Sequence, residues 1–244
     1  MSFLKLAVIC AFIVAVFGDP EVDFPMKACH RGSDDYSSCL RLAIQESWPT
    51  FVKGVPELDV PVLDPFFVKE EETRYNSESL QGKIVAKNVR TYGLAKAKFL
   101  SVRPEFTDDF YRLQVDVDLP KLLVEGDYKA EGQLGDFKMG GKGSFNISME
   151  DIHSTWDISG HVKNDRWVIE HFRAVPEITT MKVWFNGLFD GNDELNAAAM
   201  AFVNEYWPVV YRQMLPHIQD TWDKELTEFA NRIFSKISFS KTFP

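Results

Sequence analysis

The 244-residue sequence has few cysteines, few histidines and none of the signatures of the common enzyme classes. It contains three cysteines and five histidines, and no serine lies in a G-x-S-x-G motif, the signature of many serine hydrolases. The H-E-x-x-H zinc motif, the phosphate-binding P-loop and the dinucleotide fingerprint are also missing. We therefore expect a protein that is not an enzyme and that needs neither a metal nor a cofactor.

A long apolar run occurs only at the N-terminus. Residues 6–17 form an unbroken run of twelve apolar residues, whereas a membrane-spanning helix needs about 20. A single lysine precedes the run, and Val16 and Gly18 are small enough for a signal-peptidase site. We expect residues 1–18 to be a secretory signal peptide, with a buried strand or a retained anchor as the alternative. Residues 19–244 are then expected to be secreted and extracellular, with no stable membrane insertion.

Basic residues are fewer than acidic ones. The chain has 27 Lys and Arg against 36 Asp and Glu, a net charge of −9. Without the expected signal peptide, which holds one lysine and no acidic residue, the net charge is −10. A negative surface disfavours binding to nucleic acid and to anionic membranes. We therefore expect neither as a partner.

Two covalent modifications are expected. Cys10 leaves with the signal peptide, so the mature chain keeps Cys29 and Cys39. Outside the cell these two should form a disulfide; a metal site made by both thiols and His30 is the alternative. Asn146-Ile147-Ser148 is a sequon for N-linked glycosylation, so Asn146 is expected to lie at the surface and to carry a glycan.

Two segments have apolar residues at helical spacing. The first covers residues 34–53, where Ser33 or Asp34 can cap the start and Gly54 can end the helix. The second covers residues 193–236. Twenty phenylalanines in the chain indicate a core, or a cavity, with much flat apolar surface.

The C-terminal segment has two apolar stripes rather than one. At 100° per residue their centres differ by about 150°. Pro208 and Pro216 bracket this change of phase. We predict a long helix that is kinked or broken within residues 208–216.

The central region, residues 66–189, alternates apolar and polar residues as strands do. The predicted strand segments are 84–89, 95–102, 113–119, 122–128, 145–149, 156–161, 167–172 and 181–185. Turn signals lie at residues 125–127, 134–136, 140–143 and 163–165. Short linkers favour antiparallel pairing, and internal glycines favour a strongly coiled sheet.

A curved sheet has a concave face to fill, and a long apolar helix has to be buried. The simplest fold is of the α+β class: a highly curved antiparallel sheet wraps the long kinked C-terminal helix, and a short N-terminal helix closes one end. No linker rich in Gly, Pro or Ser divides residues 19–244, so a single domain is expected. Within the sheet, Asp116 and Asp118 share one face of a strand; a solvated outer face is favoured over a calcium pair.

The N-terminal half carries an ordered set of motifs. Cys39-Leu40-x-x-Ala43-Ile44 precedes Gly54-Val55-Pro56-Glu57-Leu58 and Val60-Pro61-x-Leu63-Asp64-Pro65, a proline-rich connector expected to be extended. Further motifs lie at residues 124–128, 141–145, 188–195, 202–207 and 231–237. Together they resemble the insect takeout and juvenile hormone-binding protein family over essentially the whole mature chain. Two mature cysteines, rather than four, resemble the takeout branch.

The resemblance implies a secreted carrier with an internal apolar tunnel and no catalysis. Its ligand is expected to be a juvenile hormone-like isoprenoid, a fatty acid or a similar lipid, and its role to be in clock- or feeding-related signalling. It is expected to be a monomer, with any receptor or carrier partner unknown. The residues expected to contact the ligand come from the two helices: Trp48, Phe51, Phe202, Tyr206, Met214, Ile218 and Trp222.

Two other functions stay open. A secreted signalling or interaction protein would act through a receptor and keep the cavity only as a vestige. An esterase acting on the hormone is disfavoured because the nucleophile motif is missing.

Overall fold

The computed structural model describes residues 22–76, 80–134 and 137–244. The expected signal peptide and most of the expected turn at 134–136 lie outside these ranges. The elements are α1 (Tyr36–Val52), η1 (Pro56–Leu58), β1 (Phe66–Asn76), β2 (Leu80–Tyr92), η2 (Leu94–Lys96), β3 (Lys98–Thr107), β4 (Phe110–Leu134), β5 (Phe137–Lys163), β6 (Arg166–Phe185), α2 (Asp193–Phe234) and α3 (Phe239–Thr242).

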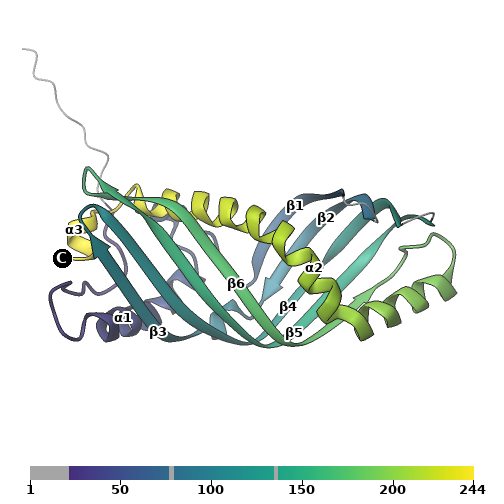
Figure 1. Ribbon diagram of the computed structural model, residues 1–244, viewed down its shortest axis with the longest axis horizontal. Coiled ribbons are helices and arrows are strands. Elements are labelled where there is room, and N and C mark those ends of the chain that lie inside the picture. The colour runs from purple at the N-terminus through teal and green to yellow at the C-terminus, as the bar shows by residue number, and fades with distance from the viewer. Residues whose placement is uncertain (1–21, 77–79, 135–136) are drawn as a thin grey trace, which may run out of the picture.

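The six strands form one antiparallel sheet, which is strongly curved (Figure 1). The strand order is β1-β2-β4-β5-β6. Strand β3 lies outside this order and pairs with β4. Strand β4 is long enough to pair with β3 along residues 110–118 and with β2 along residues 123–134. The expected α+β class, with a curved antiparallel sheet, a long C-terminal helix and a short N-terminal helix, is confirmed.

The strands are fewer and longer than predicted. The expected turns at 125–127 and 140–143 are wrong, because both segments lie inside continuous strands, β4 and β5. Gly141 is needed for a different reason: a Cβ atom there would collide with the carbonyl oxygen of Gly187, in the segment that returns across the sheet. The expected turn at 163–165 is confirmed, since Asn164 and Asp165 adopt φ of 52° and 58° between β5 and β6.

Helix α1 begins and ends close to the predicted positions, but its start is not capped as expected. Asp35 is the N-cap residue and makes no side-chain capping bond. The Ser33 hydroxyl instead donates to the carbonyl of His30. Gly54, with φ of 90°, follows the last turn and allows the chain to leave the helix.

The main core lies between α1, the sheet and the C-terminus. Leu40 of α1 and Val117 of β4 are fully buried there. Tyr36 and Tyr111 share a hydrogen bond of 2.9 Å between their hydroxyls, and burial is the main cause of the raised pKa of both phenols. This core fixes α1 on the sheet.

The proline-rich connector is not extended throughout, which corrects the prediction. It contains η1, and Val55 and Val60 pair across that turn. Leu58 and Val60 are buried against Ile233 and Ile237, at and just beyond the end of α2. Through these packing contacts the connector, which follows α1 in the chain, holds the C-terminal end of α2.

The expected disulfide is present. Cys29 and Cys39 are bonded, with their Cα atoms 5.9 Å apart, and Cys29 is buried in the main core. The bridge ties the segment before α1 to the first turn of that helix. Its contribution to the free energy of unfolding is limited because the loop that it closes is short.

Replacing Cys29 and Cys39 together by serine is expected to lower the free energy of unfolding by about 3 kcal/mol, because the unfolded chain regains loop entropy. Urea unfolding of the full mature chain measures this loss. Wild-type protein unfolded in a thiol reductant is the control and should show the same loss. A loss below about 1 kcal/mol in both would contradict the estimate.

Helix α2 is continuous through both of its prolines, and Figure 1 shows that it bends along its length. The predicted kinked helix is therefore present, and the alternative of two separate helices is wrong. Pro208 and Pro216 cannot donate backbone hydrogen bonds to the preceding turn. The Arg212 side chain contacts the same region, donating to the carbonyl of Pro208 at 3.1 Å.

Candidate functional site

The two ligand-contact candidates from α1 lie in core clusters. The Trp48 ring is half-buried and packs against Phe99 and Trp156, with centroids 5.2 and 6.0 Å away. Its Nε1 donates to the carbonyl of Leu94 at 2.8 Å. Phe51 packs in the second core cluster, 5.3 Å from the ring of Phe24.

The five candidates from α2 lie apart from these cores. Phe202, Tyr206 and Trp222 are 56%, 46% and 37% exposed, while Met214 and Ile218 are half-buried. The rings of Phe202 and Tyr206 lie 4.9 Å apart. The structure thus groups the two aromatic candidates Phe202 and Tyr206, and does not bring them together with Trp48 and Phe51 in one core cluster.

Helix α2 is held along the free backbone edge of β6. Asn204 accepts from the N–H of Val183 and donates to its carbonyl, at 2.9 and 2.7 Å. Asn231 makes the same pair of bonds to Ile169, both at 2.8 Å. Tyr211 donates to the carbonyl of Pro176 at 2.8 Å. These side chains take the place of a further strand, which an exposed sheet edge would otherwise attract.

A charged side chain of α2, Asp223, also binds the edge of β6. Asp223 accepts from the N–H of Phe172 at 2.9 Å and contacts Nδ1 of His171 at 2.8 Å. The same backbone N–H contacts the Thr227 hydroxyl at 2.9 Å. The pKa of Asp223 is lowered; burial opposes the shift, while hydrogen bonds from His171 and from the backbone favour the carboxylate. The sequence-based prediction missed all of these edge contacts.

In the first half of α2, four exposed apolar residues lie on the opposite side of the helix from the edge contacts of Asn204 and Tyr211. At 100° per residue, the side chains of Leu195, Phe202, Tyr206 and Val209 fall within about 60° of one another, and Asn204 points about 180° away. All four are exposed. We call these four residues the α2 apolar face. A contiguous exposed face of this kind marks a binding surface more often than a random scatter of apolar residues does.

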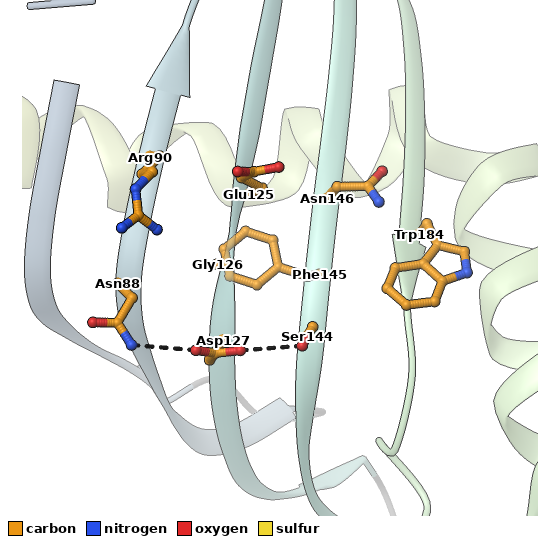
Figure 2. Close-up of a pocket in the computed structure, with 9 residues that line it drawn as sticks. All are labelled: Asn88, Arg90, Glu125, Gly126, Asp127, Ser144, Phe145, Asn146 and Trp184. Atoms are coloured by element: carbon orange, nitrogen blue, oxygen red, sulfur yellow. Dashed lines mark hydrogen bonds between the residues drawn. The ribbon is translucent and has the colours of Figure 1, made fainter. Parts of the chain in front are cut away.

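Two open depressions lie on the described part of the sheet. One, of about 300 Å³, lies across β2, β4, β5 and β6 and includes Glu125, Asn146 and Trp184 (Figure 2). The other, of about 280 Å³, includes Asp118, Asp151 and His153. Polar side chains supply much of the lining of both, so neither is the expected apolar tunnel, which stays a prediction.

The Asp116 and Asp118 carboxylates have protein partners. Asp116 accepts from Arg103, Ser101 and Thr155, and the Arg103 hydrogen bond is the main cause of its strongly lowered pKa. Asp118 contacts Nδ1 of His153 at 2.8 Å. In the described ranges, no cluster of three or more His, Cys, Asp or Glu side chains has the arrangement of a metal site.

The pKa of His153 provides a test of the contact between Asp118 and His153. This pKa is raised above the ordinary value of 6.5, mainly by the hydrogen bond to Asp118, which favours the imidazolium. We expect Asp118→Asn to lower the pKa of His153, measured by NMR titration of the ring, while Asp127→Asn leaves it unchanged. The stabilisation from this exposed pair is present at low pH and lost as pH rises through the raised pKa. An unchanged His153 pKa in Asp118→Asn would contradict the contact.

No helix in the three described ranges is long and apolar enough to cross a membrane. The charged residues of α2 are distributed along its whole length.

Comparison with known proteins gives consistent results. The model of the haemolymph juvenile hormone binding protein family matches residues 6–244. Circadian clock-controlled protein daywake from Drosophila yakuba is 25% identical over 229 residues, which cover 90% of this chain and 87% of the relative. Its Drosophila melanogaster counterpart is 24% identical over the same extent.

A solved structure supports the fold. The crystal structure of Takeout 1 from Epiphyas postvittana matches with a TM-score of 0.72 and 21% sequence identity. The match covers 89% of this chain and 99% of Takeout 1.

Proposed function

Because this chain belongs to the haemolymph juvenile hormone binding protein family, we propose that it is a secreted carrier of a small hydrophobic ligand. The family is named for binding and not for catalysis, and we propose no catalytic step. After loss of residues 1–18, residues 19–244 act as one monomeric extracellular domain. The names of the two daywake relatives support a clock-related role.

The α2 apolar face is the observation that carries the proposal. Its four large side chains are exposed while the opposite side of the helix is fixed to β6. Covering such surface with an acyl or isoprenoid chain releases water and contributes about 0.8 kcal/mol per buried CH₂ group. The Tyr206 hydroxyl supplies a polar group that can orient an ester or carboxyl oxygen. Met214, Ile218 and Trp222 belong to the second apolar stripe, about 150° around the helix from the α2 apolar face, and keep their predicted role as separate contacts. Trp48 and Phe51 keep theirs at the α1 end.

A titration with a fluorescent fatty acid tests the proposal. Saturable binding is expected for the mature chain, and the double variant Phe202→Ser with Tyr206→Ser should raise the Kd at least about tenfold, through loss of roughly 1.4 kcal/mol or more of contact energy. Leu42→Ser is the matched control, because Leu42 is an exposed apolar residue on α1. Equal affinity of all three proteins would contradict a role for the α2 apolar face.

A second candidate is a signalling or interaction protein that acts through a receptor. The two open depressions favour it, since polar side chains supply much of the lining of both. Under this candidate the mature chain shows no saturable binding of the fatty acid probe, and cross-linking to receptor-bearing cells captures the protein. Saturable probe binding that depends on Phe202 and Tyr206 favours the carrier.

A further inference from the structure

One row of residues crosses the larger depression from strand to strand. Arg90, Glu125, Asn146 and Trp184 are cross-strand neighbours on β2, β4, β5 and β6 in turn. Figure 2 shows Glu125, Asn146 and Trp184 side by side on the near side of the strands, with a helix behind the strands. Neighbouring strands are about 4.8 Å apart, so a group of one sugar ring's size attached to Asn146 reaches both flanking positions.

Asn146 is free to be modified. It begins the sequon Asn146-Ile147-Ser148, whose middle residue is not proline. Its side chain is half-buried at the edge of a depression of about 300 Å³. Within the described ranges its amide makes no side-chain hydrogen bond. Modification therefore breaks no side-chain hydrogen bond of the described residues.

Trp184 provides an apolar platform next to this amide. It is 43% exposed and lies at the end of this row, on the edge strand β6. The indole ring presents a flat apolar surface with a polar edge, the type of surface against which the C–H face of a pyranose ring packs. A sugar on Asn146 would cover the exposed part of Trp184.

Polar groups complete the row on the other side of Asn146. Glu125 accepts from the Tyr92 hydroxyl through Oε1 at 3.0 Å, which leaves Oε2 for a sugar hydroxyl. The Arg90 guanidinium lies 5.3 Å from the centre of the Phe67 ring, with N–H groups suited to an acetyl carbonyl. Apolar and polar partners thus lie on opposite sides of the attachment point.

We propose that Asn146 carries an N-linked glycan whose first N-acetylglucosamine occupies this depression and stacks on Trp184. The donor is an oligosaccharide linked to a lipid diphosphate. A bond forms between Asn146 Nδ2 and C1 of the sugar, the bond from C1 to the diphosphate oxygen breaks, the lipid diphosphate leaves as the anion, and the amide proton is released. Transfer takes place while residues 146–148 are still unpaired. The inference rests on the secretion part of the proposed function alone and not on the ligand.

Intact mass tests the attachment. The full mature chain is secreted from insect cells under a heterologous signal, so that export does not depend on residues 1–18. Wild type is expected to carry the excess mass of one glycan, Ser148→Thr to keep it and Ser148→Ala to lose it. Secreted wild type without excess mass overturns the proposal, while the fatty acid titration on the same sample tests the carrier function independently.

Thermal unfolding tests whether the first sugar of the glycan stacks on Trp184. Enzymatic removal of the glycan is expected to lower the Tm of wild type by about 2–4 °C, the size of one net stacking contact in a chain of this length. The same treatment should leave the Tm of Trp184→Ala unchanged and lower that of Trp184→Phe as in wild type. Val175→Ala, which removes an exposed apolar residue of the same strand, should show the same Tm shift as wild type. An equal shift in wild type and Trp184→Ala overturns the stacking.

Discussion

Replacing Trp167 by alanine is expected to lower the free energy of unfolding by about 3–5 kcal/mol. Trp167 is 1% exposed, and its ring meets those of Tyr111, Phe234 and Phe243 at centroid distances of 4.8, 4.8 and 6.1 Å. These three residues come from β4, from the last turn of α2 and from the C-terminus. The large cavity left by alanine therefore loosens three elements at once. Urea unfolding of the mature chain measures the loss.

Trp167→Phe is the control for this substitution. The Trp167 Nε1 group is buried without a hydrogen-bond partner in the described ranges, and a buried unsatisfied donor costs about 1–3 kcal/mol. Phenylalanine removes that donor and keeps an aromatic ring, so the net loss should stay below about 1.5 kcal/mol. A loss below about 1 kcal/mol for Trp167→Ala would contradict the central position of this ring.

Asn231→Asp is expected to cost about 2–3 kcal/mol. Asn231 both accepts from and donates to the backbone of Ile169, with both distances 2.8 Å. Aspartate has the same shape but cannot donate, so its charged oxygen faces the Ile169 carbonyl. The half-buried donor is lost and a repulsive contact replaces it, which should release the C-terminal half of α2 from the edge of β6.

Hydrogen exchange locates this effect. The amide of Ile169 is expected to exchange faster in Asn231→Asp, while amides in the centre of β4 stay protected. Glu228→Gln, an exposed charge change on the same helix, is the control and should alter stability by less than about 0.5 kcal/mol. If the amide of Ile169 in Asn231→Asp exchanges at the same rate as in wild type, the role given to the asparagine is contradicted.

Much of the fold followed from periodicity, because a helix and a half-buried strand leave different apolar patterns. The strand lengths did not follow, since a glycine signals a turn and a close backbone approach equally well. Gly141 is the clearest example: the segment around Gly187 that makes it necessary lies 46 residues further along the chain. A local pattern cannot carry that information.

The edge contacts of α2 were missed for a related reason. Asparagine is a poor helix former and is usually read as a solvent-facing residue. Asn196, Asn204 and Asn231 each donate to and accept from one backbone position, at Phe189, Val183 and Ile169. Asparagines repeated along the helix were the available signal. Their partners depend on which strand forms the sheet edge.

The ligand-contact candidates illustrate a second limit of prediction from sequence. Trp48 and Phe202 are both aromatic residues at helical spacing, yet Trp48 packs in a core and Phe202 is exposed. Sequence spacing gives the side of a helix on which a residue lies. It does not give the volume left between that side and the rest of the protein, so core and binding surface have the same pattern.

Native mass spectrometry of the secreted mature chain, after exposure to a lipid extract, tests the carrier proposal most directly. We expect a second species heavier by the mass of one small hydrophobic molecule, which dissociates on activation and is weakened in the Phe202→Ser, Tyr206→Ser double variant. The Leu42→Ser control should retain it. Detection of the unliganded mass alone, at every lipid concentration, would contradict the proposal that this protein carries a hydrophobic ligand.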